Sequence, residues 1–120
     1  MSHQDSNELS GIEVAMTTSQ THRRELILTL EGLKNRVIAR EPGCACEIFE
    51  DLAVPNRFLW SEWWVSKEEC ESAKTSERFR ALLGAVEVLG SLESVRHVTR
   101  ARGDGRHPGL PVPTGTGTPA

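Results

Sequence analysis

The sequence lacks a long apolar run, an excess of positive charge and a regular set of cysteines. No stretch approaches the ~18–20 consecutive apolar residues that a membrane span needs, so we expect no membrane partner. The first ten residues lack the basic-then-apolar order of a signal peptide, which predicts a cytoplasmic protein. The formal net charge of −3 gives no overall attraction to nucleic acid. Four arginines near the C-terminus are interpreted as solvated strand-edge charge, so we expect no nucleic-acid partner; they are Arg96, Arg100, Arg102 and Arg106.

The three cysteines are an odd number in a chain for which we expect no export signal, so we expect no disulfide framework. Cys44 and Cys46 would lie on one face of a strand about 6.5–7 Å apart, beyond the usual disulfide span. With Cys70 and His97 they leave open a metal or thiol-sensor site, against the alternative of small buried apolar residues. A Gly-rich phosphate loop, a nucleophile elbow and a spaced metal motif are all missing from the sequence. Nucleotide-binding, hydrolase and metalloenzyme functions therefore have no positive support, and we expect no metal.

The composition divides the chain into three parts. Half of the residues in 103–120 are Gly or Pro, which predicts a disordered tail. Residues 1–10 are polar and are expected to be a flexible N-terminus. The remaining segment, 11–102, is predicted to form one domain, small enough for self-association to help complete its core.

Hydrophobic periodicity within 11–102 changes between strand and helix patterns. Ile12, Val14 and Met16 alternate with less apolar residues, which is typical of a half-buried strand. The predicted strands cover 11–17, 44–49, 57–65 and 92–100. A helix capped by Ser19 or Thr21 and ending before Pro42 lies between the first two strands. Two helices lie between the last two strands: a short one capped by Ser66 in a capping box with Glu69, and one capped by Ser76 and ending at Gly90.

This order predicts an α+β fold of the ferredoxin-like type, β-α-β-β-α-β, with an antiparallel sheet. The strands over 44–49 and 57–65 are expected to form a hairpin around the turn at Pro55-Asn56. Helices would cover one face of the sheet and leave the other face to a ligand or a second subunit.

Four short segments resemble the antibiotic biosynthesis monooxygenase family. They are Glu41-Pro42-Gly43-Cys44, Pro55-Asn56-Arg57-Phe58, Glu62-Trp63-Trp64-Val65-Ser66-Lys67-Glu68 and Ser76-x-x-Phe79. The resemblance implies a homodimer in which two ferredoxin-like sheets form an α+β barrel, with a pocket between each sheet and its helices. It also implies a cofactor-independent monooxygenase that oxidises a phenol or quinol, with no cofactor, although fold alone does not fix function.

By this resemblance, Trp64 corresponds to a pocket tryptophan and Glu62 to the glutamate that accompanies it. Many relatives carry a His where counting places Ala73, and haem-degrading relatives carry their iron-binding His where counting places Leu83. Neither side chain moves protons or binds iron, and the first strand lacks the Asn of the haem-degrading members, so haem degradation is disfavoured. The chain also has no Tyr, and therefore lacks the phenol that some polyketide-oxidising relatives place in the pocket.

These considerations predict a site on one face of the strand over 57–65. The substrate-binding residues would be Phe58, Trp60 and Trp64, which provide flat walls for a small aromatic molecule. Glu62 would be the catalytic base, made a better proton acceptor by its apolar surroundings, and His97 a second proton handler.

Each assignment has a structural alternative. The tryptophans, including Trp63, would equally serve as core or dimer-interface anchors. Glu62 would accept from a Trp indole or pair with Arg57 or Arg96, and His97 would be a surface residue. A non-catalytic binding or regulatory barrel that has lost the chemistry is thus the alternative function.

Overall fold

The computed structural model describes residues 8–101 as four strands and three helices. Along the chain the elements are β1 (Glu8–Thr18), α1 (Arg23–Arg40), β2 (Cys44–Glu50), β3 (Arg57–Trp64), α2 (Lys67–Lys74), α3 (Glu77–Leu89) and β4 (Gly90–Ala101). The strands form one antiparallel sheet in the order β2-β3-β1-β4. The α+β, ferredoxin-like prediction is confirmed, with α2 as an additional short helix. The tail predicted over 103–120 and most of the flexible segment predicted over 1–10 lie outside the described residues.

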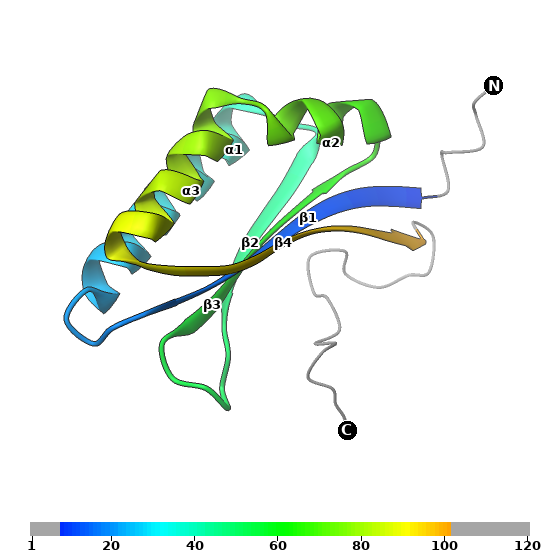
Figure 1. The fold of residues 1–120 in the computed structure, drawn as a ribbon. Helices are drawn as coiled ribbons and strands as arrows, with labels where there is room; N and C mark the ends of the chain where they lie inside the picture. The colour runs from blue at the N-terminus through cyan, green and yellow to red at the C-terminus, as the bar shows by residue number, and fades with distance from the viewer. Residues whose placement is uncertain (1–7, 102–120) are drawn as a thin grey trace.

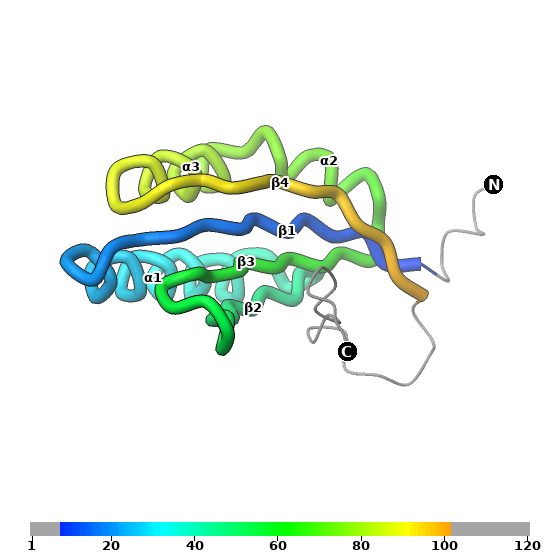
Figure 2. The backbone as a smooth tube through the Cα atoms, turned by 60° about the horizontal axis from the view of Figure 1, so that its bottom comes forward, coloured from blue at the N-terminus to red at the C-terminus, as the bar shows by residue number. Residues whose placement is uncertain are grey.

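All three helices lie on one side of the sheet (Figure 1). The core fills the space between them, where Ile12, Val14 and Met16 of β1 are fully buried beneath the apolar residues of α1 and α3. Figure 2 shows the opposite face of the sheet, where β4, β1 and β3 pass in front of the helices. No helix of the described residues covers this face. None of the helices in the described residues has the length and hydropathy needed to cross a membrane.

Local sequence signals place most of the element ends. The Oγ atoms of Ser66 and Ser76 accept hydrogen bonds from the N–H groups of Glu69 and Phe79, as predicted for helix caps. The other half of the predicted capping box, a bond from the Ser66 N–H to the Glu69 side chain, is wrong, because the Glu69 carboxylate lies beside Gly43. Ser66 Oγ also donates a hydrogen bond to the Glu68 carboxylate.

Three element starts differ from the predicted ones. The β1 strand begins at Glu8, three residues before the predicted Gly11. The cap of α1 is His22, because Ser19 and His22 close a turn ahead of the helix, in which Ser19 Oγ accepts from the His22 N–H at 3.2 Å. The β4 strand begins at Gly90, directly after α3. A Cβ on Gly90 would lie 2.1 Å from the carbonyl oxygen of Thr17, so only glycine allows this close approach.

The helix-free face of the sheet has its own polar features. The Trp63 ring lies against Gly11, where a Cβ would stand 2.7 Å from Cε3, and Arg100 stacks over the same ring at 5.2 Å. Glu13 accepts from Arg96 at 2.7 Å. Among residues 8–101, Trp63 Nε1 and the Oγ of the fully buried Ser61 have no hydrogen-bond partner. This face therefore carries polar atoms that the described chain does not satisfy.

Candidate active site

The helix-facing side of β3 gathers the predicted site residues in one row. Because side chains alternate along a strand, Phe58, Trp60, Glu62 and Trp64 all point toward the helices. Their exposed fractions are 4%, 1%, 0% and 5%. The structure thus places these four residues on one face covered by the helices, with Phe58 about 20 Å along the strand from Trp64.

Glu62 is a buried carboxylate with both oxygens occupied. Its Oε2 accepts from Trp60 Nε1 at 2.8 Å and from Arg78 Nη1 at 2.6 Å, and its Oε1 accepts from Arg78 Nη2 at 3.0 Å. The acceptor role toward an indole that the sequence left open is therefore present. The predicted ion pair of Glu62 with Arg57 or Arg96 is wrong, because its cationic partner is Arg78. Arg57 pairs with Asp51 and Glu93, and Arg96 pairs with Glu13.

Arg78, at the start of α3, is the functional candidate that sequence reasoning missed. Its guanidinium also donates from Nε and Nη2 to Glu41 at 2.7 and 2.9 Å, so it joins two carboxylates. Burial acts to lower the pKa of Arg78, but the hydrogen bonds to Glu41 and Glu62 outweigh it and raise the pKa, which keeps the side chain charged. The signal was its position inside the Ser76-x-x-Phe79 segment, beside a residue that contacts the core.

Trp64 presents an unused hydrogen-bond donor inside the core. Its Nε1 is buried and has no acceptor among the described residues, whereas the indole of Trp60 is bound to Glu62. Leaving a buried N–H without an acceptor costs on the order of 1–3 kcal/mol. Such a group marks a place where an oxygen atom of another molecule would be stabilised.

His97 lies in the same row of the sheet as Glu62 but not in contact with it. Ile12 is the register partner of both residues, so one strand separates them and, at ~4.8 Å per strand, their Cα atoms are roughly 10 Å apart. His97 is exposed, whereas Glu62 is fully buried. The predicted pair of proton handlers therefore shares one face without a direct contact.

The three cysteines lie at the edge of this site. Cys44 and Cys46 are register partners of Trp64 and Glu62, and Cys70 of α2 is fully buried in the same core. Burial raises the pKa of all three thiols, to about 12 for Cys46 and about 11 for Cys70, with the nearby Glu62 charge adding to the shift. The thiol form is thus favoured, and within residues 8–101 no group of three or more His, Cys, Asp or Glu residues is arranged to hold a metal.

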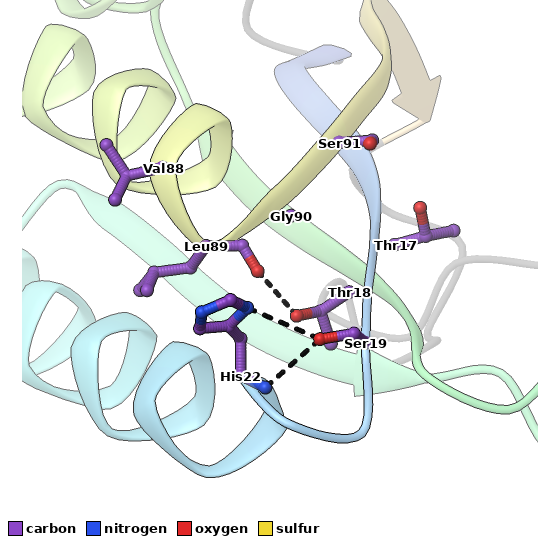
Figure 3. A pocket seen from close by; sticks show the side chains of 8 residues that line it. All are labelled: Thr17, Thr18, Ser19, His22, Val88, Leu89, Gly90 and Ser91. Atoms are coloured by element: carbon purple, nitrogen blue, oxygen red, sulfur yellow. Dashed lines mark hydrogen bonds between the residues drawn. The ribbon is translucent and has the colours of Figure 1, made fainter.

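A shallow hollow of about 410 Å³ lies where the β1–α1 connection meets the junction of α3 and β4 (Figure 3). Ser19 Oγ lies 3.3 Å from His22 Nδ1 there, and Thr18 donates to the Leu89 carbonyl at 2.6 Å. None of the predicted site residues lines it. Trp64 pairs with Ser10 near the opposite end of β1, so the hollow is separate from the Trp64 end of the predicted site, whereas Phe58 pairs with Met16 and lies nearer to it.

The antibiotic biosynthesis monooxygenase family model matches residues 11–84, which is more than half of the chain. The chain belongs to this family. The match spans the elements from β1 into α3 and includes Trp64, Glu62 and Arg78. Membership supports monooxygenase chemistry at the level of the family, and no curated protein matches the chain.

Solved structures show the same fold. A candidate antibiotic biosynthesis monooxygenase from Deinococcus radiodurans is 19% identical, with a TM-score of 0.64 over 83% of this chain and 96% of that one. Another from Nitrosomonas europaea is 15% identical, with a TM-score of 0.67 over 84% and 96%. A protein of unknown function from Bacteroides thetaiotaomicron, given as a possible oxidoreductase, is 20% identical, with a TM-score of 0.63 over 80% and 99%. At these identities the likeness establishes the fold alone.

Packing residues fill the two positions at which the resemblance placed a histidine in some relatives. Ala73 is 6% exposed within the core, and Leu83 is half-buried against it. Of the two predicted proton handlers, Glu62 lies on β3, and His97 lies on β4, which is separated from β3 by β1.

Proposed function

We propose that the protein is a cofactor-independent monooxygenase that oxidises a phenol- or quinol-type aromatic molecule between β3 and the helices. The observation that carries the proposal is the unpartnered Nε1 of Trp64 in a buried row of aromatic side chains. An indole N–H in that position would donate to the oxygen of a phenol, its anion or a ketone, while Trp60 flanks the ring. Phe58 lies six residues, or about 20 Å, along β3 from Trp64, under Arg23, and is left out of this proposal. Membership of a monooxygenase family supports this chemistry.

The reaction requires no external reductant if the substrate supplies the electrons. Removal of the phenolic proton makes the ring an electron donor to dioxygen. A ring C–H or CH₂ carbon then gains one oxygen atom as a carbonyl, and the second oxygen atom leaves as water with the two hydrogens removed. This chain would bind and orient the ring, exclude water and accept the proton. Glu62 would accept it on Oε1, which accepts a single hydrogen bond, from Arg78 Nη2, whereas Oε2 accepts two.

We also propose that the helix-free sheet face pairs with a second copy of this chain. Support comes from the unpartnered Trp63 Nε1 and Ser61 Oγ on that face, and from the half-buried Leu59 and Phe49 beside them. Sedimentation of the full chain is expected to give a dimer. A monomer at micromolar concentration would contradict this part of the proposal.

Dioxygen consumption by metal-free protein with hydroquinones, anthrones and naphthols tests the proposed activity. Trp64→Phe keeps the ring and removes only the N–H, so turnover is expected to fall by at least about tenfold. Trp63→Phe is the matched control, because it removes the same group from the opposite sheet face, and turnover is expected to persist. Equal rates in the two variants would refute the assignment of Trp64.

The second candidate function is a binding or regulatory barrel without catalysis. The pairing of Glu62 with Arg78 and Trp60 favours it, because three of the four lone pairs of the carboxylate already accept hydrogen bonds. Stoichiometric binding of a naphthol, with no product after long incubation in air, would support this candidate over the first.

A further inference from the structure

Arg78 joins two carboxylates that differ sharply in exposure. The Glu62 side chain is fully buried, whereas the Glu41 side chain is 29% exposed and Arg78 is 14% exposed. The Nη1/Nη2 edge of the guanidinium faces Glu62, and the Nε/Nη2 edge faces Glu41. Two edges of one guanidinium are thus each used as a two-point binding site for a carboxylate.

Neither Glu41 nor Arg78 lies where its own helix would favour it. Glu41 caps the C-terminus of α1, where a negative charge opposes the helix dipole. Arg78 is the second residue of α3, where a positive charge opposes the dipole as well. Their placement is therefore explained by their contact with each other and with Glu62, and not by the stability of the separate helices.

The two edges of the guanidinium differ in whether their bound carboxylate could be exchanged for another. The inner edge is committed to Glu62, because a fully buried carboxylate without its cation would be strongly destabilising. The outer edge is bound by a side chain in partial contact with water, so its displacement leaves Glu41 able to reach solvent. An external carboxylate of the same geometry would satisfy the outer edge equally well.

We propose that the Nε/Nη2 edge of Arg78 binds an anionic group of the ligand, and that Glu41 occupies this edge when no ligand is present. This rests on the proposed function for the aromatic part of the ligand, which would lie beside Trp60, the other partner of Glu62. The ligand class is therefore an aromatic molecule that carries a carboxylate. Glu41 acts as an internal competitor that sets the affinity for it.

Calorimetric titration of the full chain without dioxygen tests this assignment. The probes are 1-hydroxy-2-naphthoate and its uncharged amide, which share the ring and phenol and differ in charge. Wild type is expected to bind the carboxylate more tightly than the amide. Glu41→Gln is expected to raise carboxylate affinity about tenfold and leave amide affinity unchanged, because a charged competitor is replaced by a neutral one. Glu71→Gln is the matched control, since it removes one carboxylate from the exposed surface of α2 and should change neither affinity.

A variant that lacks Arg78 needs a second substitution at Glu62, so that no unpaired charge is left in the core. Arg78→Met with Glu62→Gln removes cation and buried anion together, and the double variant is expected to bind both probes equally. Unchanged carboxylate affinity in Glu41→Gln, or a preserved preference in the double variant, would overturn the role of Arg78 while leaving the proposed function in place. Failure of both probes to bind wild type would overturn the two proposals together.

Discussion

Replacement of Arg78 by Met should destabilise the fold more than any other loss of a single ion pair. The change leaves the fully buried Glu62 with only the Trp60 indole as a partner. Removing one member of a buried pair costs about 3–5 kcal/mol. At about 4–8 °C per kcal/mol for a domain of this size, Tm should fall by at least about 12 °C at a fixed protein concentration.

The assay is urea and thermal unfolding followed by circular dichroism, with two comparison variants. Glu41→Gln removes only the partly exposed half of the network and should cost about 0–1 kcal/mol. Arg78→Met with Glu62→Gln should recover at least about 1 kcal/mol of the loss, because a neutral amide is less costly to bury than an unpaired carboxylate. If Arg78→Met destabilised the protein no more than Glu41→Gln, the claim that Arg78 compensates a buried charge would be refuted.

Three further predictions concern other parts of the fold. Gly90→Ala should destabilise the fold by about 1–3 kcal/mol, because the new Cβ would overlap the Thr17 carbonyl. Gly84→Ala, in the exposed middle of α3, should stabilise the fold by about 1 kcal/mol. Equal effects of the two changes in urea unfolding would contradict the close approach at Gly90. The pKa of Cys46 is raised from 9.0 to about 12, so the unfolded thiol loses its proton first and stability present below pH 9 should be lost as pH rises toward 12. Cys46→Ala should flatten the decline of unfolding free energy in that window, and an unchanged slope would count against the buried thiol. Native Cys70 should react slowly with iodoacetamide at pH 8, in line with its raised pKa and full burial, and labelling as fast as in urea would show that α2 opens freely.

The fold was largely predictable because its signals are local. Alternation in β1 and β3, the Ser66 and Ser76 caps and the Pro55-Asn56 turn each depend on a few neighbouring residues. Asn56 indeed adopts a positive φ of 63°, which Asn tolerates in a turn.

The candidate site was only partly predictable because its key contacts join distant segments. Period-two alternation placed Trp60, Glu62 and Trp64 on one face, and the indole contact of Glu62 follows from that spacing. The bond from Arg78 to Glu62 depends on how the start of α3 packs over β3, and no local pattern in the sequence encodes that packing. The exposure of His97 likewise depends on β4 being an edge strand of the sheet.

The unpaired N–H of Trp64 could not be inferred from the sequence either. All three tryptophans are nearly fully buried, yet only the indole of Trp60 has an acceptor within the described residues. That difference depends on which acceptor atoms reach each ring after folding. It separates Trp60 from Trp63 and Trp64, whose N–H groups have no acceptor within the described residues.

The most direct test of the central claim is isotope labelling of a single oxidation. Chelator-treated protein would be incubated with an anthrone under ¹⁸O₂, and the product analysed by mass spectrometry after correction for the reaction without protein. Catalysis by this chain predicts a carbonyl product carrying one ¹⁸O atom per molecule, formed by wild type and lost in Trp64→Phe. Product formed no faster than without protein, or equally fast with Trp64→Phe, would contradict it.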